Sequence, residues 1–198
     1  LDEVKAELED VIKAAERMLA NNWEFFKDAV GAYDFNRIVY LGANCLKGIA
    51  QESQLKILEL TAGRVATMYD SPMGFRHGPK SIINDDTLTI VYLSDDPYTR
   101  QYEVDLIKEM SPQRKGNKLM AIMNNRDEEV AGLVDYAFSF DLDNEHENAF
   151  LGFDYIVAAQ VLALFKSLSY DITPDNPCPT GEVNRVVKGV ILHPYTKK

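Results

Sequence analysis

The sequence is poor in the residues and runs that mark several classes of protein. Cysteine occurs only as Cys45 and Cys178, without CxxC or Cys/His metal spacing. Neither a zinc site nor a redox pair is therefore indicated. No run of 18 apolar residues exists, so we expect no transmembrane span. The first residues, LDEVKAELED, lack a basic start and a hydrophobic segment. We therefore expect no signal peptide, and a cytoplasmic protein with reduced thiols.

Cations are also scarce. Lysine and arginine number 21 against 31 aspartates and glutamates, for a net charge of −10. This balance argues against a nucleic-acid surface and against binding to anionic membranes. An anionic metabolite remains an acceptable ligand only where a local cluster of donors and cations holds it.

The common nucleotide and nucleophile motifs are missing as well. The chain has no GxxxxGK[ST] and no GxSxG, and its first glycine-bearing loop, LGANCLKG, has the wrong spacing for GxGxxG. The three histidines, His77, His146 and His193, are too scattered for a zinc set. We expect neither a metal nor an organic cofactor.

What is present is an ordinary globular composition with a regular alternation of elements. The apolar fraction is 46% over 198 residues, enough for one domain with a full core. Short apolar runs alternate with segments of helical periodicity, which predicts an α/β fold: an αβα sandwich with a five-stranded parallel sheet and helices on both faces. The predicted strands cover 36–42, 64–70, 87–94, 117–124 and 134–141.

The chain divides into three parts. Residues 1–30 form an amino-terminal linker and packing helix, 31–169 the domain, and 170–198 an irregular tail that ends in a docking arm. The tail is rich in proline, and its arm docks either on its own domain or on a partner subunit. Because the sequence lacks an initiator Met and begins inside an apparent helix, we expect it to be a piece of a longer chain.

A charged face lies on the helix predicted at 45–61. Glu52, Lys56 and Glu59 are spaced i, i+4, i+7, which places them on one side. One interpretation is a solvated face with Glu–Lys pairing. The other is a functional carboxylate: Glu59 lies between two leucines at the helix end, where partial desolvation suits a general base.

The stretch GFRHGPKS, residues 74–81, contains the second candidate. His77 lies in a turn that opens a helix, with Pro79 suited to the first helical position. Gly74 and Gly78 allow a close backbone approach, and Lys80 stands near a helix amino terminus, where the dipole disfavours a cation. His77 is either incidental to the turn or the reason for it.

Together the two features resemble one family. ESQLKILELTAG, followed about fifteen residues later by FRHGPKS, is similar to the second sugar isomerase (SIS) domain of sugar-phosphate isomerases. YDSPMGFRHGPKS, DPYTRQYEVDL and GEVNRVVKGVILHP are similar to the bacterial family of tagatose-6-phosphate ketose/aldose isomerases, also described as galactosamine-6-phosphate deaminases. The resemblance covers residues 36–195.

The resemblance implies a role for each motif residue. Glu59 falls on the base that moves a proton between adjacent sugar carbons, and His77 on the histidine that opens the sugar ring. Glu52, Arg76 and Lys188 fall on positions close to the substrate. This chemistry requires no metal, and a histidine that titrates near neutrality suits it.

The sequence departs from the family pattern at the phosphate-binding loop. The phosphate-binding SxSGxS loop is absent, and the corresponding loops read GANCLKG and YLSDDPYT. The chain therefore resembles the second half of a tandem pair. It implies a missing N-terminal SIS domain, a homodimer and little turnover from this piece alone. Two other interpretations stay open: a non-catalytic module that binds a phosphosugar, and a structural dimerisation domain.

Overall fold

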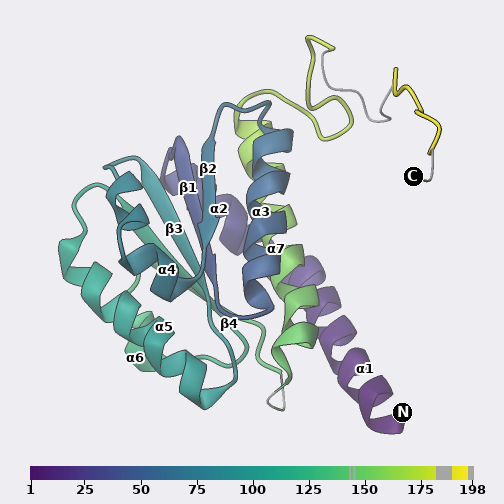
Figure 1. Ribbon diagram of the computed structural model, residues 1–198. Helices are drawn as coiled ribbons and strands as arrows, with labels where there is room; N and C mark the ends of the chain where they lie inside the picture. Colours follow the sequence, from purple (N-terminus) through teal and green to yellow (C-terminus); the bar gives the residue numbers. More distant parts are fainter. Residues whose placement is uncertain (143, 145, 182–188, 196–198) are drawn as a thin grey trace.

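The computed structural model describes residues 1–142, 144, 146–181 and 189–195. Five strands form one parallel sheet in the order β2-β1-β3-β4-β5 (Figure 1). Each strand lies inside a range predicted from the apolar runs, so the predicted sheet is confirmed. The strands are β1 Arg37–Gly42, β2 Ala66–Asp70, β3 Thr87–Tyr92, β4 Lys118–Met123 and β5 Tyr136–Ser139.

Helices connect the strands and cover both faces of the sheet, which confirms the predicted αβα sandwich. The helix predicted at the amino terminus is interrupted by a π-helical segment, Met18–Asn22. The α-helices are α1 Asp2–Arg17, α2 Glu24–Ala32, α3 Leu46–Leu60, α4 Pro72–Arg76, α5 Pro97–Met110, α6 Glu128–Ala131 and α7 Asn148–Ser169. Two 3₁₀ segments, Pro79–Ile82 and Ser111–Gln113, follow α4 and α5.

The inner strands are buried on both sides because each face of a parallel sheet is covered by helices. Side chains alternate along β1: Ile38 and Tyr40 belong to one core cluster, Val39 and Leu41 to the other. The continuous apolar run IVYL in the sequence is the direct consequence of this two-sided burial.

One face of the sheet is covered by α1, α2, α3 and α7. Three tyrosines fix this layer: the ring of Tyr92 stacks between Tyr40 and Tyr155, with centroids 6.0 and 5.3 Å away. The Tyr92 hydroxyl forms a 2.7 Å hydrogen bond with Ser53 Oγ of α3. This hydrogen bond connects α3 to β3 inside the core.

The opposite face is covered by α4, α5 and α6, whose Phe75, Leu106 and Val130 share the second core cluster. Figure 1 shows α3 on one side of the sheet and α4 with α5 on the other. The helix with the charged face and the turn that contains His77 therefore belong to opposite layers.

Helix α7 is long and apolar enough to cross a bilayer by length and composition, but half of its most apolar window is buried inside the domain. It contacts α1, α2 and α3 and contains a buried aspartate and a buried lysine, Asp154 and Lys166. These contacts are those of a core helix.

The described part of the tail after α7 has no regular helix or strand. Residues 171–181 contain turns and one isolated bridge, between Thr173 and Asn176. The centre of the predicted docking arm, residues 182–188, lies outside the described residues, and the predicted substrate contact Lys188 lies there with it.

Candidate functional site

The charged face of α3 exists as predicted. Lys56 Nζ lies 3.2 Å from Glu52 Oε1 and 3.1 Å from Glu59 Oε2. Burial lowers the pKa of Lys56, but the hydrogen bonds to Glu59 and Glu52 outweigh it and raise the pKa. The side chain of Glu59 is 48% exposed, so the expected desolvation is not present in this chain. Glu59 is a paired carboxylate that a substrate can reach.

Local backbone geometry explains the two glycines in the turn at residues 74–81. Gly74 N donates a 3.1 Å hydrogen bond to Ser71 Oγ, the N-cap of α4. A Cβ at Gly74 would lie 2.8 Å from Asp70 Oδ1, so a larger residue there must displace the Asp70 side chain. Gly78 has a φ of 149°, and Pro79 begins the 3₁₀ segment. His77 therefore stands exposed between two short helices.

The two cations of this turn bind α5. Arg76 Nε lies 2.6 Å from Glu109 Oε2, and Lys80 Nζ bonds the other oxygen of the same carboxylate. The hydrogen bond from Lys80 leads the interactions that hold the pKa of Glu109 below its usual range. The ion pair with Glu109 explains why Lys80 can stand near a helix amino terminus, where the helix dipole disfavours a cation. No spacing rule pairs Glu109 with Lys80, 29 residues away, so sequence reasoning missed it.

The two motifs lie on helices of opposite layers. Ile57, beside Glu59 on α3, packs in the first core cluster, whereas Phe75, beside His77, packs in the second. The sheet separates these clusters. Glu59 and His77 are therefore attached to helices of opposite layers.

The carboxyl edge of the sheet has a hollow at its topological switch point. The chain leaves β1 into α3 on one face and leaves β3 into α5 on the other, which is where parallel sheets bind ligands. A cavity of about 270 Å³ lies there. It is lined by Ala43, Asn44, Ser71, Pro72, Met73, Tyr98, Thr99, Tyr102 and Glu103.

Glu103 is the residue of this hollow that sequence reasoning missed. It is fully buried, and its Oε2 accepts hydrogen bonds of 2.8 and 3.1 Å from Ser94 N and Ser94 Oγ. Burial raises its pKa to about 7, against the opposing effects of Ser94 and Arg100. Its spacing with the buried Leu106 and Met110 is the signal that it faces the interior.

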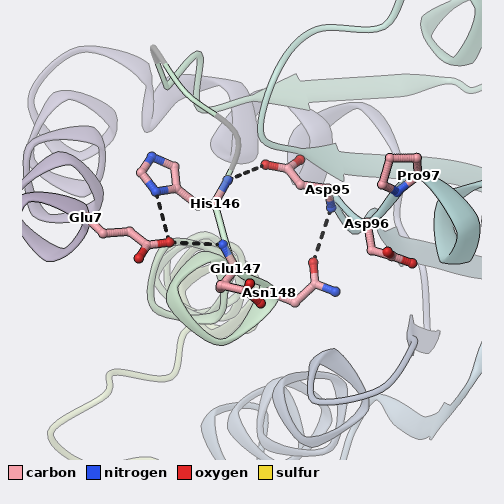
Figure 2. A pocket seen from close by; sticks show the side chains of 7 residues that line it. All are labelled: Glu7, Asp95, Asp96, Pro97, His146, Glu147 and Asn148. Atoms are coloured by element: carbon pink, nitrogen blue, oxygen red, sulfur yellow. Dashed lines mark hydrogen bonds and ion pairs between the residues drawn. The ribbon is translucent and has the colours of Figure 1, made fainter. Parts of the chain in front are cut away.

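A second hollow, of about 480 Å³, lies where the loop after β3 meets the start of α7 (Figure 2). His146 Nδ1 lies 3.4 Å from Glu7 Oε1, and His146 N donates a 3.0 Å hydrogen bond to Asp95 Oδ2. The hollow is lined by Glu7, Asp95, Asp96, Pro97, His146, Glu147 and Asn148. Four carboxylates disfavour an anion here, and the contacts tie α1 to the sheet edge. Among the described residues, no group of three or more His, Cys, Asp or Glu side chains suits a metal ion.

A match to a protein-family profile over most of the chain shows which family the chain belongs to. The SIS domain profile matches residues 33–165, which are the five strands with their connecting helices and most of α7. The chain belongs to the SIS-domain family. The predicted family and fold are thereby confirmed.

Individual SIS proteins match almost the whole chain. D-galactosamine-6-phosphate deaminase AgaS of Escherichia coli is 42% identical over 189 residues, 94% of this chain and 48% of the relative. The structure of tagatose-6-phosphate ketose/aldose isomerase from Escherichia coli has a TM-score of 0.81 and 38% identity, over 95% of this chain and 47% of that one. A candidate isomerase of the same name from Clostridium novyi NT has a TM-score of 0.93 and 47% identity, over 98% and 50%. The chain spans about half the length of these relatives.

Proposed function

We propose that this SIS domain is the catalytic half of a sugar-phosphate isomerase. It acts on tagatose 6-phosphate or galactosamine 6-phosphate by proton transfer between adjacent sugar carbons. The observation that carries the proposal is identity of 38–47% over more than nine tenths of the chain to proteins of these two names. The proposed motif residues Glu52, Glu59, Arg76 and His77 are all present and accessible in part.

Each side chain has a chemical task in this proposal. His77 exchanges a proton with the ring oxygen and the anomeric hydroxyl, which opens the sugar. Glu59 takes a proton from one carbon and returns it to its neighbour, through an enediol-like intermediate. For the amino sugar the same route ends with loss of ammonia. Glu52, Arg76 and Lys188 contact the substrate. The ion pair with Lys56, 3.1 Å away, holds the Glu59 carboxylate in place on α3.

The substrate site is completed by a second domain. Because Glu59 and His77 lie in opposite layers, each faces a different neighbour, and one active site takes Glu59 from one copy and His77 from another. This domain also lacks a phosphate loop of hydroxyl groups, so the missing half of the tandem pair supplies the grip on phosphate. Assembly as a homodimer of tandem chains follows. Sugar phosphates are held inside cells by their charge, which supports a cytoplasmic protein.

The test is to measure the rate with both substrates for Glu59→Gln and His77→Ala in the full-length protein. Loss of a general acid or base lowers kcat by about 10²–10⁴-fold. Glu16→Gln on the exposed side of α1 is a matched control that keeps the wild-type rate. Retention of wild-type rates by both variants would exclude the catalytic assignment.

Comparison of the two substrates separates isomerase from deaminase in the same assay. Residues 1–198 assayed alone should give little turnover, because they contain no SxSGxS loop to bind the phosphate. Robust turnover by this piece alone contradicts the shared site.

A further inference from the structure

A third cavity lies at the amino edge of the sheet, opposite to the edge at which α3 and α5 begin. Its volume is about 270 Å³. Its walls come from the segments that precede β3 and β4, the end of α5 and the two 3₁₀ segments. None of the motif residues Glu52, Glu59, Arg76 and His77 lines this amino-edge cavity. It is therefore separate from the proposed catalytic set.

The two loops that meet at this cavity are in direct contact. A Cβ at Gly116 would lie 2.9 Å from Asp85 O, so the loop before β4 can approach the loop before β3 this closely only with a glycine there. In the loop before β3, Thr87 Oγ1 donates a 2.6 Å hydrogen bond to Asn84 Oδ1. In the loop before β4, Lys115 N donates a 3.0 Å hydrogen bond to Asn117 Oδ1. The walls are thus formed without a ligand, as ligand sites usually are.

Two asparagine side chains of the cavity keep an unused donor. The contacts above occupy the carbonyl oxygens of Asn84 and Asn117, which leaves the two NH₂ groups. Neither group has a hydrogen-bond partner among the described residues. Asn117 is only 8% exposed, yet its Nδ2 is reachable from solvent. Two donors held by a fixed amide plane suit a planar oxygen acceptor such as a carboxylate.

The cavity has one unpaired charge of each sign. Lys115 and Asp85 line it, are exposed, and form no ion pair with any described residue. Lys80 lines it as well, but its Nζ is bonded to Glu109 and lies 3.2 Å from Gln113 Oε1. A phosphate dianion would therefore find a single free cation and a repelling carboxylate. A molecule with one carboxylate and one ammonium pairs both charges.

Part of the wall is apolar. Met110 is buried in the second core cluster, and Ile83 packs against the same cluster while it remains partly exposed. Both side chains line the cavity. An apolar wall beside a few fixed polar groups is the usual composition of a small-molecule site, and it favours a ligand with a short aliphatic group.

We propose that the amino-edge cavity binds a small α-amino acid with an aliphatic side chain. The carboxylate of the ligand accepts from Lys115 Nζ and from the amide groups of Asn84 and Asn117. Its ammonium donates to the carboxylate of Asp85, and its side chain lies on the apolar wall. The site goes beyond the proposed catalysis and does not depend on it, because the two share no residue.

The test is a calorimetric titration of the full-length protein with L-leucine, together with hydrogen exchange read by mass spectrometry. Exchange should slow at residues 82–86 and 113–117 when L-leucine is bound. Two analogues separate the charges: 4-methylpentanoate lacks the ammonium, and 3-methylbutylamine lacks the carboxylate. Each should bind about tenfold more weakly, because it leaves one charge of the cavity unpaired. Inorganic phosphate should not compete with L-leucine.

Two variants test the assigned partners. Lys115→Gln and Asp85→Asn each remove one unpaired charge and should weaken L-leucine binding by about fivefold. Asp85→Asn should not weaken 4-methylpentanoate, which has no ammonium to lose a partner. Both side chains are exposed, so the variants should fold as the wild type does. Lys13→Gln on α1 and Asp28→Asn on α2 are matched controls at exposed positions and should bind as the wild type does.

The proposal is overturned if L-leucine gives neither heat nor slower exchange at the cavity, or if both cavity variants bind it unchanged. Equal binding of 4-methylpentanoate or phosphate would also overturn it, because the cavity would then be a plain anion site. The rate measured with the Glu59 and His77 variants is a separate readout, so failure of one proposal is distinguishable from failure of the other.

Discussion

One buried side chain, Asp154, makes the stability of the fold depend on pH. Asp154 of α7 is fully buried, and neither carboxylate oxygen has a hydrogen-bond partner among the described residues. Burial raises its pKa to about 7, against the opposing charge of Arg17 on α1. Since an aspartate in the unfolded chain titrates near pH 4, this residue couples stability to pH.

The sign of the effect follows from proton counting. Between about pH 4 and pH 7 the folded protein keeps a proton on Asp154 that the unfolded chain releases, so the free energy of unfolding falls as the pH rises. Asp154→Asn removes this loss. We expect the variant to be about 2 kcal/mol more stable than the wild type at pH 8 and equal to it near pH 4.

Urea unfolding at both pH values measures the difference. Glu16→Gln, an exposed carboxylate on α1, is the control and should change neither value. Equal stabilities of Asp154→Asn and the wild type at pH 8 would show that Asp154 is not held neutral by burial.

Sequence reasoning reached the two motif residues but not the buried acids. Glu59 and His77 stand out because their local patterns, a one-sided charged helix and a glycine-flanked turn, are readable within a few residues. Glu103 and Asp154 become unusual only after the chain has folded, because their burial comes from segments distant in the sequence. Helical spacing with Leu106 and Met110 indicates only that Glu103 faces the interior, and it does not indicate the raised pKa of either acid.

At the scale of elements, the sheet and its helices were predictable and the arrangement of the two motifs was not. Apolar runs such as IVYL in β1 identify a strand buried on both faces, and their alternation with helices fixes a parallel sheet. The handedness of the connections then decides which face each helix covers. The separation of α3 from α4 by the sheet follows from that three-dimensional path.

The turn between α4 and the 3₁₀ segment at Pro79–Ile82 is held by one carboxylate. Glu109 of α5 bonds both Arg76 and Lys80. Glu109→Gln removes the charge that both cations share, and we expect a loss of about 1 kcal/mol in stability. The amides of residues 77–81 should exchange hydrogen faster, while exchange in β3 stays unchanged.

Hydrogen exchange read by mass spectrometry tests this directly. Glu129→Gln breaks an exposed pair with Lys108 and is the matched control, with no change expected at residues 77–81. Unchanged exchange of that segment in Glu109→Gln would mean that packing of Phe75, and not the ion pairs, positions His77.

At the scale of the whole molecule, the proposed activity depends on assembly. The domain spans about half the length of its relatives, the helices of its two motifs lie in opposite layers, and it has no SxSGxS loop of its own. A site built between copies satisfies all three observations. In a closed two-fold assembly each chain then serves two sites, giving Glu59 to one and His77 to the other.

The most direct test of this central claim is a mixing experiment with two inactive variants. Full-length Glu59→Gln and His77→Ala proteins are unfolded together, refolded as a mixture, and assayed for turnover. Where the residues of one site come from different copies, half of the dimers are mixed and each has one intact site. The mixture should therefore regain about a quarter of the wild-type rate. A mixture that stays at the rate of the separate variants would show that Glu59 and His77 act from the same copy, and would contradict the account.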